Sequence, residues 1–294
     1  MTPPGPRPHR STRRRLVARG WITDQHGAWP MATVPIVVGA LTGGARWEHL
    51  ALLAGWVAGF LFFNAASLWL RAPRRARYRP ALLAWAGVAA GFGLLLVVLA
   101  PRLLWWVPVF APLVAVALVE AWRRRGRSLP SRLSAVIACG LTCAVAYDWA
   151  TGLVRPEGAW RAGEAWPWRD AAALTGSAPA PSTGWTHAWI VTALLTAYFI
   201  GSVPYVRSLI RERGDRRWIA GSAAWHALAT GGAVSAAALG AVSWAAPALW
   251  ALLTARALLV PWDQARRGPW KPLSIGLGEV AACLLTAAAL LLPA

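Results

Sequence analysis

The sequence has few acidic residues and little charge of either sign. Only 11 of its 294 residues are Asp or Glu, and charged residues make up 14% of the chain. Soluble proteins of this size carry about 25% charged residues. Such a scarcity of acids makes a hydrolase with paired carboxylates an improbable function. It also argues against a water-soluble fold.

Motifs for soluble-type catalysis and metal binding are absent as well. The chain has no Gly-rich phosphate loop after a strand, no serine nucleophile elbow and no paired-histidine zinc motif. It has three cysteines, without zinc-type spacing. Cys139 and Cys143 would face the same side of a helix, as a redox or metal pair or, as we favour, as small residues packed inside a span. We therefore expect no metal site and no cofactor.

Long apolar runs are what the chain has in abundance. Hydrophobic residues make up 57% of it, and several runs reach the roughly 20 residues that cross a bilayer. Prolines punctuate the connections between the runs. These features predict an all-α fold, a polytopic transmembrane bundle of about nine spans that forms a single domain over residues 21–294. The expected spans are 29–45, 49–70, 81–100, 103–122, 133–150, 187–206, 219–236, 239–260 and 273–292.

The arginines predict which way the spans run. The Pro- and Arg-rich tail, residues 1–20, carries six Arg, and the connections 71–80, 123–132 and 207–218 carry five each. With nine spans, all of these lie on one side, which the positive-inside rule assigns to the cytoplasm. We therefore expect a disordered cytoplasmic tail and a C-terminus outside the cell. Residues 151–186 would form a long external loop.

The basic net charge does not indicate nucleic acid binding. The formal charge is +19, but the arginines sit in short connections between apolar runs rather than on one face of a soluble domain. The preference for Arg, Ala, Gly and Pro is typical of a GC-rich bacterial genome. We expect a protein of the bacterial plasma membrane whose partners are membrane lipids, with an oligomeric state that the sequence leaves open. Tryptophans at expected span ends, including Trp47, Trp106, Trp122 and Trp149, would anchor the interfaces.

Four polar residues lie inside expected spans at a similar depth. Asn64, His226, Arg256 and Glu279 would all lie roughly 6–10 Å below the cytoplasmic surface at 1.5 Å per helical residue. Intramembrane polar groups are costly, so this level predicts a shared cavity that opens to the cytoplasm.

Three further candidates complete that predicted polar layer. Gln25 and His26 precede the first span on the same side, and Arg207 follows the sixth. Simpler interpretations stay open for the residues within the spans. Arg256 and Glu279 could form a buried ion pair between the last two spans, His226 could be a packing residue, and Asn64 could join helices.

Three stretches of the chain carry motifs: Gln25-His26-Gly27-Ala28-Trp29 with Pro35 and Gly39, the stretch Gly201 to Asp215, and Pro272 to Gly276 followed by Glu279. In these motifs the chain resembles the YwiC-like family of bacterial membrane proteins. The resemblance covers most of the chain after residue 21 and implies a multi-pass membrane protein. It implies no particular biochemical activity.

A more distant resemblance is to the UbiA-type intramembrane prenyltransferases. Asn64 opens a stretch that Arg77-Tyr78-Arg79-Pro80 closes, and Gly214-Asp215-Arg216 follows the sixth span. The resemblance implies nine spans and a cavity that faces the cytoplasm. However, Ala65 and Leu68 stand where that family has aspartates for Mg²⁺, so we do not expect ordinary prenyl transfer.

Two kinds of function follow from the predicted polar layer. The first is binding of a hydrophobic small molecule, a lipid or quinone-type isoprenoid, in the inward-facing cavity. The alternative is a transporter for a small solute or ion, which proline-broken spans would favour. An assembly partner of a respiratory complex is a third idea, supported only by the membrane location.

Overall fold

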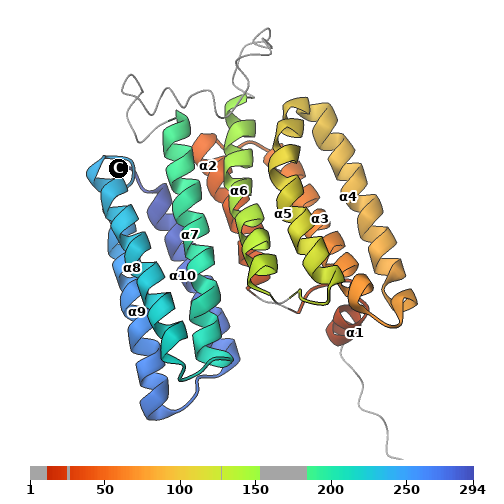
Figure 1. The fold of residues 1–294 in the computed structure, drawn as a ribbon. Helices are drawn as coiled ribbons and strands as arrows, with labels where there is room; N and C mark the ends of the chain where they lie inside the picture. Colours follow the sequence, from red (N-terminus) through yellow and green to blue (C-terminus); the bar gives the residue numbers. More distant parts are fainter. Residues whose placement is uncertain (1–11, 25–26, 127, 153–183) are drawn as a thin grey trace, which may run out of the picture.

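The chain folds into helices joined by short connections. The computed structural model describes residues 12–24, 27–126, 128–152 and 184–294, and this part of the chain contains helices but no strand. Figure 1 shows the helices side by side along one common direction. The elements are α1 (Thr12–Ala18), α2 (Ala28–Gly43), α3 (His49–Arg71), η1 (Arg75–Arg77), α4 (Arg79–Leu99), η2 (Pro101–Trp106), α5 (Val107–Trp122), α6 (Leu129–Gly152), α7 (Gly184–Ile210), α8 (Arg216–Ala238), α9 (Ala245–Arg267) and α10 (Pro272–Leu291).

A helix covers most of each of the nine segments expected to span the bilayer. Seven helices are long and apolar enough to cross a membrane: α3, α4, α5 with η2, α6, α7, α9 and α10. The helix α2 has only 16 residues, and α8 is not among the seven although it has 23. The chain is therefore a multi-pass helical membrane protein, and the count of nine spans stays a prediction.

The outermost helix shows that apolar side chains face outward. The helix α4 has the highest hydropathy of the seven, yet its most apolar stretch has no buried residue. Leu83, Leu94 and Val98 expose 59%, 68% and 70% of their surface. A water-soluble protein does not leave such a contiguous apolar face uncovered. Hydrocarbon is the solvent that suits it.

Two helices at the centre divide the bundle into two parts. The helix α2 packs along α6, and both also contact α3 on one side and α7 on the other. The helices α4 and α5 complete the first part, and α8, α9 and α10 complete the second. Among the described residues, α3, α4 and α5 make no contact with α7 to α10.

Glycines allow the two central helices to touch. A Cβ added at Gly39 would lie 2.0 Å from the carbonyl oxygen of Cys143, and one added at Gly43 would lie 2.6 Å from Cβ of Ala150. Small residues spaced by four on one helix face are a common means of close helix contact in membranes. Cys139 and Cys143 are both free and buried, and Cys143 packs as a small residue against this face, as favoured from the sequence.

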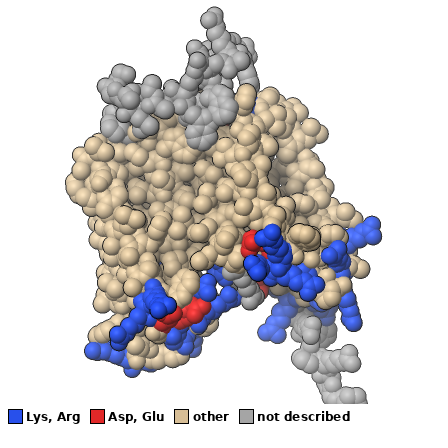
Figure 2. Space-filling model, viewed as in Figure 1, with Lys and Arg blue, Asp and Glu red and all other residues tan. Residues whose placement is uncertain are grey.

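The basic side chains gather at one end of the molecule, as the charge pattern predicts. Figure 2 shows Lys and Arg at the end where α3, α5, α7 and α9 finish. The helix α1 lies at this end, and α10 finishes at the other. This arrangement agrees with an odd number of crossings.

Residues near the N-terminus include a short helix where a disordered tail is expected. Residues 12–18 form α1. The turn that follows rests on η1 and α4, because Gly20 adopts a φ of +80° next to the ring of Tyr78 and Trp85 donates a hydrogen bond to the carbonyl of Trp21. These contacts fix where α1 lies. Most of the expected external loop, residues 153–183, lies outside the described residues.

The tryptophans at helix ends do not all serve as interface anchors. Trp47 and Trp122 expose 72% and 68% of their surface, as anchors should. Trp106 and Trp149 are instead buried in the part formed by α2, α3 and α6. Trp106 donates a hydrogen bond of 3.1 Å to Asp148. A partner for the indole N–H explains why this ring can leave the interface.

Candidate functional site

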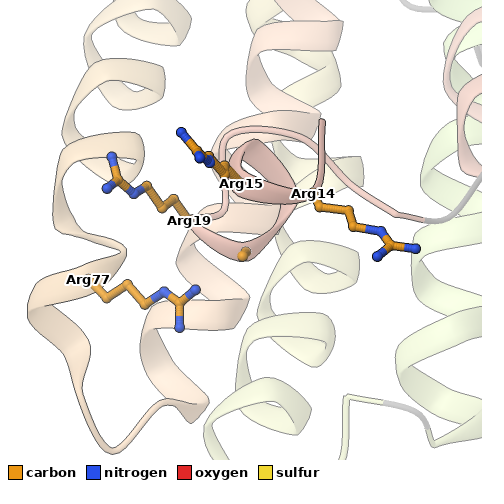
Figure 3. Close-up of a pocket in the computed structure, with 5 residues that line it drawn as sticks. Arg14, Arg15, Arg19 and Arg77 are labelled. Atoms are coloured by element: carbon orange, nitrogen blue, oxygen red, sulfur yellow. The ribbon is translucent and has the colours of Figure 1, made fainter. Parts of the chain in front are cut away.

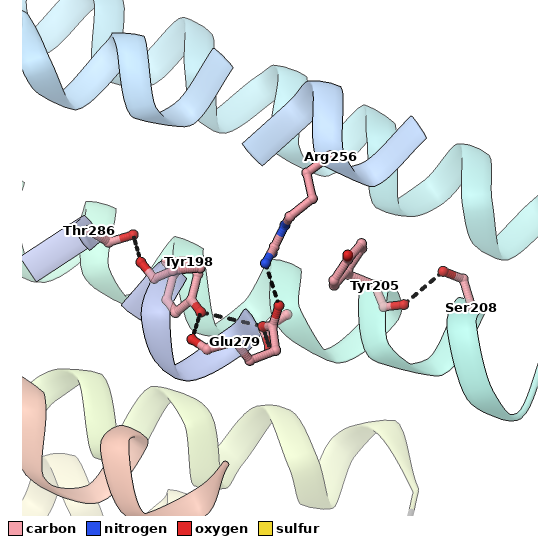
Figure 4. A network of polar contacts seen from close by, with 8 residues as sticks. Tyr198, Tyr205, Ser208, Arg256, Glu279 and Thr286 are labelled. Carbon is pink, nitrogen blue, oxygen red and sulfur yellow. Dashed lines mark hydrogen bonds and ion pairs between the residues drawn. The ribbon is translucent and has the colours of Figure 1, made fainter. Parts of the chain in front are cut away.

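A buried ion pair joins α9 to α10. Nη1 of Arg256 lies 2.8 Å from Oε1 of Glu279, and the two side chains expose 19% and 9% of their surface. Both come from apolar helices that qualify as membrane spans. The structure therefore confirms the pairing that the sequence left open. Figure 4 shows Arg256 reaching from α9 toward Glu279.

One face of α7 completes the surroundings of this pair. Tyr198 donates a hydrogen bond to the backbone carbonyl of Glu279 at 2.8 Å and lies 3.4 Å from Oε2, and Ser202 donates to Oε2. The guanidinium carbon of Arg256 lies 4.2 Å from the ring centre of Tyr205. A cation over an aromatic face gains electrostatic attraction, more so where water is excluded. Glu279 is thereby held by two helices besides its own.

His226 brings α8 to the same place. Its ring is fully buried, and Nδ1 lies 2.7 Å from the carbonyl oxygen of Ser222. A carbonyl only accepts hydrogen bonds, so Nδ1 carries a proton, and Nε2 of the neutral ring is an acceptor. The ring lies between Tyr205 and Trp250, with centres 6.3 Å and 6.2 Å away.

Several polar atoms of this site have no partner. Nε and Nη2 of Arg256 and Nε2 of His226 are buried without a hydrogen bond from the described residues. An unsatisfied buried polar group costs about 1–3 kcal/mol, and more when it is charged. Native structures rarely tolerate such groups, so a water or ligand is expected to satisfy them. The site offers two donors from Arg256 and one acceptor from His226.

Glycine 201 makes room for the histidine. A Cβ at this position of α7 would lie 2.7 Å from Trp225 and 3.0 Å from the His226 ring. Any larger residue would push α8 away from α7. Sequence reasoning found Gly201 only as part of a family resemblance.

The structure brings together three of the seven predicted site residues. His226 and Arg256 both contact Tyr205, and Glu279 pairs with Arg256. Asn64 lies on α3, which makes no contact with α7 to α10 in the described part. Arg207 pairs with Glu212 at 2.9 Å and lies over Trp218. Gln25 and His26 lie outside the described residues.

Tyr198, Ser202 and Tyr205 are functional candidates that sequence reasoning missed. They lie four and then three residues apart, so they share one face of a helix. This polar stripe within an apolar span was the signal that could have found them. Each residue taken alone is unremarkable at membrane depth, which is why the stripe was overlooked.

The segment Gly214-Asp215-Arg216 has a structural role. Gly214 adopts a φ of +83°, and Asp215 caps α8 by accepting a hydrogen bond of 2.8 Å from the backbone N–H of Arg217. A side-chain oxygen at the N-cap satisfies a donor that the helix cannot. The resemblance of this segment to intramembrane prenyltransferases is explained by helix capping alone. Their shared fold stays a prediction.

Comparison with known proteins finds similarity to one family. Residues 22–147 match the family described as YwiC-like protein. The chain is 27% identical over 207 residues to "Uncharacterized protein YwiC" of Bacillus subtilis, which covers 70% of this chain and 74% of the relative. It is 22% identical over 207 residues, with the same coverage, to an "Uncharacterized protein" of Haemophilus influenzae. No solved structure matches the chain.

Proposed function

We propose that this chain, as a member of the YwiC-like protein family, is a multi-pass protein of the bacterial plasma membrane that binds the head group of a quinone-type isoprenoid at Arg256 and His226. The family segment 22–147 covers α2 to most of α6. The proposed site lies in α7 to α10, outside this segment.

The unsatisfied atoms of the site support a head group of this class. A quinone carbonyl accepts hydrogen bonds, and Nε and Nη2 of Arg256 are donors without a partner. The hydroxyl of the reduced form donates, and Nε2 of His226 is an acceptor without a partner. A ligand whose carbonyl reaches Arg256 and whose hydroxyl reaches Nε2 of His226 would satisfy both side chains. The proposal rests on this agreement between the unpaired atoms of the two side chains and the polar groups of a quinone head group.

The walls of the site suit an aromatic ring with an apolar tail. Tyr205 and Trp250 flank His226, and aromatic rings pack well against one another in offset or tilted arrangements. Leu252 and Leu259 of α9 expose 61% and 60% of their surface toward the surrounding solvent. In a membrane that solvent is lipid, so an isoprenoid tail can lie along α9 while its head group binds at Arg256 and His226.

Mg²⁺-dependent prenyl transfer does not fit this site. Its negative group is the single carboxylate of Glu279, which is already paired with Arg256. The stretch of α3 that follows Asn64 has Ala65 and Leu68 rather than carboxylates. Mg²⁺ that bridges a diphosphate needs such oxygen ligands. The proposal is therefore one of binding.

We predict that the purified protein retains a quinone and that Arg256→Lys lowers its content several-fold. Lysine keeps the positive charge beside Glu279 but lacks the planar fork that supplies the two free donors. The matched control is Arg266→Lys on the same helix, where the arginine also lies over a ring, that of Trp262. Lipid extraction and mass spectrometry measure the quinone per protein.

Two outcomes would contradict the binding proposal. Wild-type protein without any isoprenoid would remove it and leave transport of a small solute or ion as the alternative. Equal quinone content in Arg256→Lys and Arg266→Lys would place the quinone elsewhere. Pro204 in α7 and Pro261 in α9 would then become of interest, because prolines break the hydrogen bonding of membrane helices near transport sites.

We also predict that the C-terminus lies outside the cytoplasm. The arginine-bearing connections share one end of the bundle and α10 finishes at the other, and basic connections stay in the cytoplasm. Alkaline phosphatase fused after Ala294 should be active, and the same enzyme fused after Gly268, between α9 and α10, should be inactive. A cytoplasmic reporter at Ala294 would refute the nine-span topology.

A further inference from the structure

Arginines from two distant parts of the sequence surround one hollow beside α1. A hollow of about 270 Å³ is lined by Arg14, Arg15, Ala18, Arg19 and Arg77. Figure 3 shows Arg15 and Arg19 leaving α1 on the side where Arg77 lies, while Arg14 leaves it on the other side. A second hollow of about 380 Å³ shares Arg19 and Arg77 and is also lined by Trp21 and Pro80.

No acidic residue neutralises these arginines within the described part of the chain. The ion pairs found there involve Arg102, Arg207, Arg256 and Arg267. Like charges brought close together repel one another. Planar guanidinium groups that line one hollow are also well suited to bind the oxygens of a phosphate through paired hydrogen bonds. An anion bound in the hollow would attract all of these arginines and so offset their mutual repulsion.

Contacts of the backbone hold the cluster together. Gly20 has a positive φ and lies against the ring of Tyr78, the residue that follows Arg77. Trp85 of α4 donates a hydrogen bond of 3.1 Å to the carbonyl of Trp21. These contacts bring the end of α1 to the connection between α3 and α4. The gathering of the arginines therefore follows from the fold.

The surroundings of the hollow are apolar on the side of the membrane. Leu16 of α1 exposes 38% of its surface, and the most apolar stretch of α4 has no buried residue. The helix α1 and the connection between α3 and α4, which line the hollow, lie at one end of the bundle (Figure 1). Figure 2 shows Lys and Arg side chains at this end, which is the end assigned to the cytoplasmic leaflet. Clusters of arginine beside a membrane helix attract anionic lipids. An occupant with a phosphate and an acyl tail fits better than a free ion.

We propose that Arg15, Arg19 and Arg77 bind the phosphate head group of an anionic phospholipid, whose acyl chains lie along α4. The site is independent of the proposed quinone site, because α4 makes no contact with α7 to α10 in the described part. Bound lipid would fasten α1 to the cytoplasmic surface. It would also make this end of the protein sensitive to the anionic lipid content of the membrane.

The test is a lipid titration of the delipidated full-length protein, with native mass spectrometry to count bound lipids. Phosphatidylglycerol is expected to bind more tightly than phosphatidylcholine. The variant Arg15→Gln/Arg19→Gln/Arg77→Gln should bind phosphatidylglycerol on the order of a hundredfold more weakly. The control Arg123→Gln/Arg124→Gln/Arg125→Gln removes the same charge from the connection between α5 and α6 and should change the affinity little.

Three results would overturn this proposal. They are equal weakening in both triple variants, equal binding of the two lipids, and displacement of phosphatidylglycerol by millimolar inorganic phosphate, which would identify the ligand as a free ion. If the glutamine variant does not insert correctly, Arg15→Lys/Arg19→Lys/Arg77→Lys keeps the charge and the topology signal. That variant should bind several-fold more weakly because lysine lacks the planar fork, and unchanged affinity would equally overturn the proposal.

Discussion

Replacing Gly39 by alanine is expected to separate the two central helices and to lower the stability of the protein by ~3 kcal/mol, the upper part of the usual range for an overpacked core. The added Cβ would lie 2.0 Å from the backbone carbonyl oxygen of Cys143 and 2.7 Å from the carbonyl carbon of the same residue. Those atoms belong to the backbone of α6, so no side-chain rotation can relieve the clash. Either α2 or α6 must shift.

The matched control for this change is Gly59→Ala in α3. Gly59 also lies inside a helix, but nothing lies within 4 Å of a Cβ added there. Alanine there should leave the stability unchanged or raise it by up to about 1 kcal/mol. The measurement is the midpoint of thermal unfolding of each purified variant, with size-exclusion chromatography used to detect the folded fraction after heating. Equal midpoints would show that α2 and α6 are not in close contact at Gly39.

The consequence of losing this contact should extend beyond α2. The helices α2 and α6 connect the part formed by α3, α4 and α5 to the part formed by α7 to α10. In lipid, association of helices depends on close packing rather than on release of water. A gap between α2 and α6 therefore loosens the central pair of helices on which both parts pack.

The length of the apolar runs allowed the helices to be predicted from the sequence. It did not predict the residues at which the helices begin and end. The prediction placed the sixth and eighth spans at 187–206 and 239–260, whereas α7 runs from Gly184 to Ile210 and α9 from Ala245 to Arg267. Hydrocarbon thickness determines the apolar length, yet a helix continues until a cap or turn stops it. Gly240, with a φ of +69°, provides such a turn after α8.

Depth in the membrane predicted the site only in part, because residues at the same depth can still lie far apart in the plane of the membrane. Asn64, His226, Arg256 and Glu279 were expected to share a cavity since they lie at one level. Asn64 lies on α3, and the helices that carry the other three make no contact with α3 in the described part. Nothing in a single sequence tells which helices are neighbours in the plane of the membrane. A shared cavity for all seven predicted residues stays a prediction.

Loss of the carboxylate at position 279 is expected to destabilise the protein by ~3 kcal/mol or more, because it leaves a buried guanidinium without its anion. Glu279→Gln keeps the shape of the side chain and the backbone carbonyl that accepts from Tyr198. Arg256, which exposes 19% of its side chain, then has no anionic partner. The control is Glu120→Gln at the end of α5, a carboxylate outside the ion pairs of the described part.

A double-mutant cycle separates the ion pair from the rest of the network. Arg256→Met alone leaves Glu279 buried without a cation and should also be costly, but Arg256→Met/Glu279→Gln removes both charges. Replacement of both members of a buried pair by neutral residues is often close to neutral, so the double variant should be more stable than the sum of the single changes implies. Strictly additive losses in thermal unfolding would show that the two side chains do not pair in the membrane. A stable double variant that carries no quinone would assign the pair of Arg256 and Glu279 a role in ligand binding that the fold does not require.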